Sequence, residues 1–228
     1  MLWVVSGTGT GIGKTAAATA LVRTLRAKGA AAVGWKPVET GVVAGQLGAD
    51  QEALLSESTF HVKHKLHCSF LPAVSPHLAS RLAGIELQLE PWVRHANELR
   101  ATCHLVIELA GGLFTPLTDS QLNVDLVAML KPDCHILVAP DRLGVLHDAI
   151  ASLTAAKIKN AAPHFVLLNQ STAASASLFN ASELARFASI PILGPLPFAP
   201  IEERAAKLAL WLQRSTEALD PALISRPV

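Results

Sequence analysis

The sequence has few cysteines, little charge and no long apolar run. Its three cysteines, Cys68, Cys103 and Cys134, are scattered and form no CxxC pair. No charged segment followed by an apolar one opens the chain, as a secretory leader would. Apolar stretches such as residues 104–107 and 135–140 are far shorter than the roughly 20 residues that cross a bilayer. We therefore expect a reduced, cytoplasmic protein that does not span a membrane.

A basic surface is also missing. The formal net charge is +1, and no run of lysine and arginine alternates with aromatic residues, so a nucleic-acid partner is not expected. Half of the residues are hydrophobic and 16% are charged, which is far from the composition of disordered chains. With 228 residues, no internal repeat and no linker-like stretch, the chain is predicted to form one domain over residues 1–228.

Several catalytic motifs are absent. The sequence has no GxSxG elbow, no protein-kinase signature set and no recognisable Ser/His/Asp order. His61, His64 and His67 precede Cys68, but their spacing matches no standard zinc site, and a solvated loop is the favoured interpretation.

Short apolar runs alternate with segments of helical period, the pattern of a mostly parallel sheet with helices on both faces. The fold class is therefore α/β, three-layered and P-loop NTPase-like. Strands are expected near Leu2–Ser6, Ala32–Lys36, His104–Leu109, His135–Ala139, His164–Leu168 and Ile192–Pro195. Helices are expected near Gly13–Lys28, Ser75–Leu82, Pro91–Arg100, Asn123–Leu130, Gly144–Ile158, Ser175–Phe187 and Ile201–Gln213. Residues 40–74 are predicted to be the most irregular region.

A glycine-rich loop follows the first predicted strand. It reads Ser-Gly-Thr-Gly-Thr-Gly-Ile-Gly-Lys-Thr over residues 6–15 and is one residue longer than the standard Walker pattern. Glycines let backbone N–H groups surround phosphate oxygens, Lys14 adds positive charge, and the Thr15 hydroxyl can reach Mg²⁺. A dinucleotide fingerprint also fits Gly7 and Gly9, but Lys14 and Thr15 directly after Gly13 favour a triphosphate.

Ligands in such folds bind beyond the carboxyl ends of the strands, and three further clusters lie there. Lys36 ends a strand, where it is either a phosphate and substrate contact or simply an exposed lysine. Glu108 ends an apolar strand, and a carboxylate in that place favours a metal ligand. Asp50 fits either a second oxygen ligand or a helix N-terminal acid. The predicted helix start at 144–147 offers N–H donors to an anion, and His147 there is favoured as a surface histidine.

Taken in order, these clusters resemble the dethiobiotin synthetase family over about residues 2–198. The matching segments are residues 7–15, 34–41, 50, 70–77, 108–117, 143–144 and 169. The resemblance implies an enzyme of biotin synthesis that uses ATP and Mg²⁺ to join CO₂ to 7,8-diaminopelargonate and close the ring of dethiobiotin. An amine adds CO₂ to give a carbamate, the carbamate attacks the γ-phosphorus, and the second amine displaces phosphate, so no covalent enzyme nucleophile is needed.

The resemblance also implies a role for particular residues. Catalytic residues would be Thr10, Lys14 and Lys36. The nucleotide would be bound by Gly9, Gly11, Ile12, Gly13, Lys14, Thr15 and Asn169, with Asn169 at the adenine. Mg²⁺ would be bound by Thr15, Asp50 and Glu108. The substrate would be bound by Lys36, Thr40, Gly144, Val145, Leu146 and His147, the last four through backbone groups of the second subunit of a homodimer.

Three positions depart from the family pattern. The family usually has Asp at position 9, Gly at 109 and Asn at 147, where this chain has Gly9, Leu109 and His147. Gly9 removes an acid close to the expected Mg²⁺. A regulatory P-loop nucleotide switch, a non-catalytic homologue that only binds nucleotide, and a related amidoligase with another substrate remain alternatives. The switch ATPases that position cellular structures carry an extra lysine early in the loop, and residues 7–10 contain none.

Overall fold

The computed structural model describes residues 1–43, 45–61, 66–172 and 179–219, with side chains described as far as Gln213. The strands within these residues are β1 (Leu2–Gly7), β2 (Ala32–Trp35), β3 (Val38–Thr40), β4 (Cys68–Phe70), β5 (His104–Glu108), β6 (Cys134–Pro140), β7 (Phe165–Asn169) and β8 (Ile192–Leu196). The helices are α1 (Lys14–Ala27), α2 (Ala49–Glu57), α3 (Pro76–Leu82), α4 (Leu89–Arg100), α5 (Asn123–Leu130), α6 (Val145–Ile158), α7 (Asn180–Phe187) and α8 (Ile201–Leu219).

The main sheet has six strands in the order β2-β5-β1-β6-β7-β8, and all neighbouring pairs are parallel. From β1 the chain builds the sheet first toward β2 and β5 and then, on the other side, toward β6, β7 and β8. The carboxyl end of β1 is therefore a topological switch point, the place where ligands bind in open parallel sheets. The glycine-rich loop begins there.

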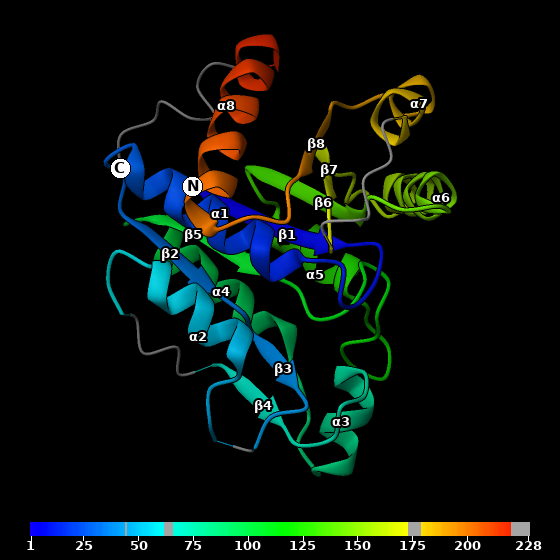
Figure 1. Cartoon of the computed structure of the whole chain (residues 1–228). Helices are drawn as coiled ribbons and strands as arrows, with labels where there is room; N and C mark the ends of the chain where they lie inside the picture. Colours follow the sequence, from blue (N-terminus) through cyan, green and yellow to red (C-terminus); the bar gives the residue numbers. More distant parts are fainter. Residues whose placement is uncertain (44, 62–65, 173–178, 220–228) are drawn as a thin grey trace.

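Each face of the sheet is covered by its own apolar core. Trp3 and Val5 of β1 pack with residues of α1, α2 and α8, whereas Leu2 and Val4 pack with α4, α5, α6 and α7 on the opposite face. Because successive side chains of a strand point to opposite faces, a strand buried on both sides reads as a continuous apolar run. The predicted three-layer α/β fold with a parallel sheet is confirmed (Figure 1).

The expected elements agree with the structure to within a few residues, with some extensions. Helix α4 begins at Leu89 because Pro91 is tolerated in a first helical turn. Helix α8 continues to Leu219. The helix expected from Ser175 begins at Asn180 within the described residues, and its predicted start lies outside them.

Residues 40–74, predicted to be the most irregular region, contain more regular structure than expected. This stretch contains α2 and β4, and β4 pairs in parallel with β3 to form a separate small sheet. Figure 1 shows β3, β4 and α3 together at one end of the molecule. The sequence signal was weak because both strands are three residues long and α2 buries only Gln51 and Leu54.

None of the described helices has the length and apolar character that a membrane crossing requires.

Candidate active site

The glycine-rich loop connects β1 to the first residue of α1, Lys14. Gly11 and Gly13 have φ angles of 70° and 92°, in the left-handed region that side chains disfavour. No side chain caps the start of α1, so its first-turn N–H groups and the positive end of the helix dipole remain available to an anion. These features are those of a phosphate-binding loop.

Asn169, at the end of β7, fastens this loop. Its side-chain Nδ2 donates to the carbonyl oxygen of Ile12 at 2.9 Å. A Cβ atom on Gly13 would lie 2.0 Å from that nitrogen, so Gly13 is required by contact as well as by φ. Asn169 Oδ1 is buried and accepts no hydrogen bond within the described residues. One end of the amide therefore holds the loop while the other keeps an acceptor, which is compatible with the predicted contact to an adenine amino group.

Lys14 lies buried under the loop. Its Nζ donates to the carbonyl oxygen of Gly9 at 2.7 Å. Burial lowers the pKa of Lys14 to about 8, although Glu108 opposes this change. The ammonium form still predominates at neutral pH, and an approaching phosphate would stabilise it further.

Four predicted residues meet beside Lys14. The Thr15 hydroxyl donates to Asp50 Oδ1 at 2.8 Å and is 3.0 Å from Glu108 Oε1. Lys36 Nζ is 2.8 Å from the same Glu108 oxygen and also forms an ion pair with Asp50 Oδ2. Parallel strand order explains the meeting, since β5 lies between β1 and β2 and brings Glu108 next to both strand exits.

The charged groups in this cluster change one another's pKa values. Burial raises the pKa of Glu108, and the charge of Asp50 raises it further against the attraction of Lys36. Burial disfavours the charged forms of Lys36 and Asp50 too, but attraction outweighs it: the two carboxylates raise the pKa of Lys36, and Lys36 lowers that of Asp50. Lys14 acts on the same two carboxylates, so two ammonium groups face Asp50 and Glu108.

The cluster fits Mg²⁺. Glu108 Oε2 is buried and has no hydrogen-bond partner within the described residues, and a buried carboxylate oxygen of this kind is costly unless it binds a cation. Hydroxyl and carboxylate oxygens are the donors that Mg²⁺ prefers. No group of three or more His, Cys, Asp or Glu side chains within the described ranges is arranged to hold a metal. Asp50 and Glu108 alone form an incomplete site that phosphate oxygens would complete.

Apart from Lys36, the residues predicted to bind substrate lie outside this hydrogen-bonded cluster, as does Thr10. Thr10 is exposed on the loop, and Thr40 is the last residue of β3. Gly144 and His147 are exposed at the start of α6, but Val145 is buried in the core and its N–H already donates to the carbonyl of Arg142 at 3.2 Å. Val145 is therefore corrected as a donor, whereas the amides of Gly144, Leu146 and His147 stay predicted contacts for a carboxylate.

Sequence reasoning missed several residues that support the site. Asn123 donates to the carbonyls of Ala110 and Gly112 at 2.7 and 2.8 Å and so fixes the turn after Glu108. Ser6 is hydrogen bonded to His135 beneath the loop at 2.7 Å. Glu39 and Gln51 hold the first turn of α2. A polar residue inside an otherwise apolar strand was the one available signal, and it was present at Ser6 and His135.

Two of the histidines considered for zinc lie within the described residues. His67 Nδ1 is 2.7 Å from the carbonyl oxygen of Lys36, and His61 is exposed. His64 lies outside the described residues.

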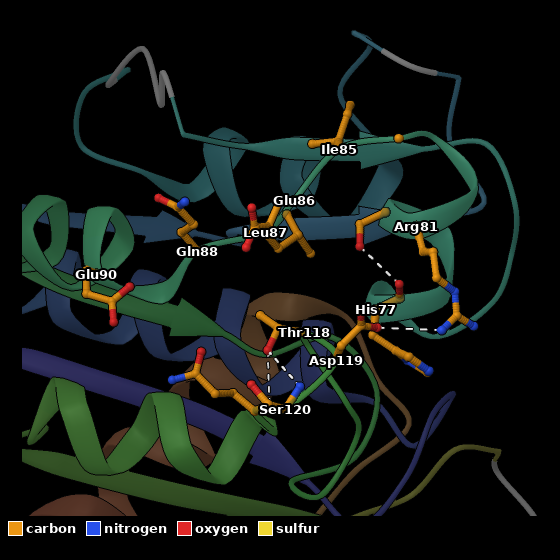
Figure 2. A pocket seen from close by; sticks show the side chains of 13 residues that line it. His77, Arg81, Ile85, Glu86, Leu87, Gln88, Glu90, Thr118, Asp119 and Ser120 are labelled. Atoms are coloured by element: carbon orange, nitrogen blue, oxygen red, sulfur yellow. Dashed lines mark hydrogen bonds and ion pairs between the residues drawn. The ribbon is translucent and has the colours of Figure 1, made fainter.

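A separate groove of about 670 Å³ lies between α3 and the loop after β5. Figure 2 shows His77, Arg81, Glu86 and Asp119 along it, and the ion pair of Arg81 with Asp119 crosses its edge. None of the predicted site residues lines this groove. The phosphate loop and the acidic cluster therefore define the candidate active site.

Comparison with known proteins agrees with this geometry. A family model described as an AAA domain matches residues 3–205. The ATP-dependent dethiobiotin synthetase BioD of Anaeromyxobacter dehalogenans (strain 2CP-1) is 35% identical over 208 residues, which covers 89% of this chain and 92% of that protein. The chain belongs to the dethiobiotin synthetase family. The BioD protein of Xanthomonas campestris pv. campestris (strain 8004) is 38% identical over 160 residues, or 68% of this chain and 70% of that protein.

Solved structures resemble this dethiobiotin synthetase family member in fold alone. MinD in the MinC:MinD cell division complex of Aquifex aeolicus and a ParA family ATPase from Chlorobium tepidum each superpose with a TM-score of 0.53 at 13% identity. Each match covers 98% of this chain and 93% of the other. They support the P-loop NTPase-like architecture.

Proposed function

We propose that the chain is an ATP-dependent dethiobiotin synthetase, which uses ATP and CO₂ to close the cyclic urea of dethiobiotin on 7,8-diaminopelargonate. The observation that carries the proposal is the meeting of Thr15, Lys36, Asp50 and Glu108 beside the phosphate loop. Family membership supports the assignment over most of the chain. We also propose that residues 1–228 form a single cytoplasmic domain, in keeping with three free cysteines.

Charge repulsion is the main obstacle in this reaction. One amine of the substrate adds CO₂ and loses a proton to give a carbamate anion, whose oxygen must attack the γ-phosphorus of ATP, itself surrounded by negative oxygens. Lys14, at the start of α1, and Lys36, directly after β2, supply two ammonium groups, and fixed cations of this kind stabilise the charge that develops during phosphoryl transfer. ADP leaves, and a carbamic-phosphoric anhydride remains.

Ring closure depends mainly on holding the second amine close to the anhydride carbonyl. The second amine attacks the anhydride carbonyl, its nitrogen loses a proton, and the C–O bond to phosphate breaks, so that hydrogen phosphate leaves with the charge and the proton. Holding the two ends together makes the step intramolecular. Thr10 and Thr40 are the hydroxyls that we assign to the carbamate and phosphate, and Asn169 Oδ1 is the acceptor assigned to adenine.

Mg²⁺ would be held by Thr15, Asp50 and Glu108 and would neutralise phosphate charge. Glu108→Gln keeps the shape of the side chain but removes its charge. We expect the Mg²⁺ concentration for half-maximal turnover to rise about ten- to a hundredfold, while the melting temperature changes little because the buried carboxylate already has a raised pKa. Unaltered Mg²⁺ dependence and unaltered nucleotide affinity by calorimetry would make Glu108 a structural residue.

The direct test uses purified protein with ATP, Mg²⁺, labelled bicarbonate and 7,8-diaminopelargonate. Acid-stable label should appear in dethiobiotin, and ADP release should depend on the diamine, because the carbamate is the phosphoryl acceptor. Brisk ATP hydrolysis without diamine and bicarbonate would favour a regulatory nucleotide switch instead. Nucleotide binding with neither hydrolysis nor product would favour a non-catalytic homologue.

We further propose a homodimer in which the start of α6 faces the site of the partner subunit. Leu143, just before that helix, is 95% exposed, and the proposed dimer would cover it. Leu143→Asp should shift the protein toward monomer in sedimentation velocity and lower turnover, whereas Leu210→Asp on α8 should do neither. A fully active monomer would show that the site is complete within one chain.

A further inference from the structure

The first turn of α2 has no cap of its own. Gly48 occupies the N-cap position in extended backbone (φ −86°, ψ 165°), and no side chain caps the helix from there. A helix start with Gly at the N-cap depends on other groups to accept its first N–H donors. This matters because Asp50, one of the two carboxylates of the site, lies in that turn.

Glu39 supplies the missing acceptors from the neighbouring strand β3. Its Oε1 accepts from the N–H of Asp50 at 3.1 Å and its Oε2 from the N–H of Gln51 at 3.3 Å. The carboxyl group is buried at the positive end of the helix, where negative charge is favoured. A Cβ atom on Gly48 would lie 2.2 Å from the Glu39 carboxyl carbon. Glycine at position 48 is thus the condition for Glu39 to reach the helix.

Gln51 joins the same turn to the exit of β2. Its Oε1 accepts from the backbone N–H of Lys36 at 2.6 Å, and the side chain is fully buried. Lys36 and Asp50 are the ion pair of the active site. One short helical turn is therefore bonded on one side to Glu39 and on the other to the backbone of Lys36.

We propose that Glu39 and Gln51 are positioning residues that set the relative placement of Lys36 and Asp50, and we call Glu39, Gly48 and Gln51 the α2 clasp. Neither side chain is in the set assigned to substrate, nucleotide or metal. The inference rests on the proposed function, because it assumes that Lys36 and Asp50 serve a metal–nucleotide complex. Its consequence is that loss of the clasp weakens the metal-dependent part of nucleotide binding.

A purely structural role would give a different result. The body of α2 is anchored independently by Leu54, which is fully buried against Gly34 of β2. The helix should stay packed when its first turn loosens. Damage from the clasp is therefore expected mainly in the placement of Asp50, whose side chain is 39% exposed and contributes little packing.

The experiment compares the affinity for a non-hydrolysable ATP analogue with and without Mn²⁺, by calorimetry, in the full-length protein. The ratio of the two affinities isolates the metal contribution from the phosphate loop. The variants are Glu39→Ala, Gly48→Ala, the pair Glu39→Ala with Gly48→Asn, and the control Glu52→Gln, which removes an exposed acid from the same helical turn. Melting temperatures are measured alongside.

Glu39→Ala should reduce the Mn²⁺-dependent gain about tenfold or more, the usual effect of losing a residue that orients a metal ligand. Metal-free affinity should not change. Gly48→Ala should do the same while keeping Glu39, because its Cβ displaces the carboxylate, and it covers the case in which Glu39→Ala fails to fold. In the double variant, Asn at position 48 takes the vacated space and caps the helix itself, so the gain should largely return. Glu52→Gln should match the wild type.

Two results would overturn the clasp: a lower melting temperature with an unchanged Mn²⁺-dependent gain in Glu39→Ala and Gly48→Ala, or no recovery in the double variant. The proposed function fails separately. A wild type that forms no dethiobiotin, yet loses its metal-dependent gain in these variants, would remove the synthetase assignment and leave the clasp standing.

Discussion

The two sides of the active site are built differently. The phosphate loop is shaped by its own backbone, with glycines at positive φ and helix N–H groups that follow from chain direction. The facing side, from β2 through α2, is shaped by buried side chains: Glu39 and Gln51 hold the turn that carries Asp50. A site formed by backbone groups uses residues that are consecutive in the sequence, whereas a site formed by side chains uses residues that are far apart in it.

The difference predicts which mutations should impair each side of the active site. On the loop side, any added side chain at Gly13 meets Asn169 at 2.0 Å, and function depends on one cation, Lys14. On the α2 side, several contacts together hold Asp50 in place, so single changes should have graded effects that a second change can restore. Three measurements test this difference between the two sides of the active site.

Lys14→Ala should have the largest effect. Removing one group that stabilises a transferring phosphoryl typically lowers kcat by about 10²- to 10³-fold, and no neighbouring group replaces an ammonium placed at Gly9. The fold should survive, because burial already opposes the charge on Lys14. Turnover and circular dichroism check both points, with the exposed Lys28→Ala as control. Turnover within threefold of wild type in the folded variant would refute the phosphate-loop assignment.

This difference also explains which parts of the site could be predicted from the sequence. The glycine spacing before Lys14 and Thr15 predicted the phosphate-loop side of the site. Glu108, at the end of an apolar strand, indicated that the site would lie where the strands end. Glu39 could not be found, because nothing in its neighbourhood indicates that its carboxylate will reach Gly48, nine residues on. The amide of Val145 was misjudged, since hydrogen bonding of a helix start to Arg142 depends on local turn geometry.

The second prediction, with an effect of intermediate size, concerns His135, which lies beneath the phosphate loop. It is fully buried, with Nε2 at Ser6 Oγ and Nδ1 at the carbonyl of Ala161, so the neutral ring donates from Nδ1 and accepts from Ser6. Burial lowers the pKa of His135 from 6.5 to about 3. Below pH 6.5 the unfolded chain therefore binds a proton that the folded chain does not, and stability falls as pH decreases toward 3, by up to about 1.4 kcal/mol per unit.

His135→Gln cannot titrate in this range. Urea unfolding between pH 7 and 4 should show a shallower loss of stability in the variant than in the wild type, with the two curves converging as pH falls. Comparing slopes removes the contributions of His104 and His164, whose pKa values are also lowered by burial. Stability curves of equal slope would show that His135 takes up a proton in the folded protein and does not stay neutral beneath the loop.

The smallest effect should come from Gly9→Asp, which restores the acid that the family usually carries. The position accepts it: an added Cβ would have Ile12 Cγ2 as its nearest neighbour at 3.9 Å, and Gly9 does not have a positive φ. The new carboxylate would lie near Lys14, whose Nζ is 2.7 Å from the Gly9 carbonyl, and would favour the charged form of Lys14.

The Asp at position 9 would add negative charge close to the Mg²⁺ ligands without touching the α2 side. Screening at an exposed loop limits such an effect to roughly 1 kcal/mol, so the Mg²⁺ concentration for half-maximal turnover should fall two- to fivefold. If that concentration rises instead, repulsion from the nucleotide phosphates outweighs attraction to the metal, and Gly9 is the better residue for this chain.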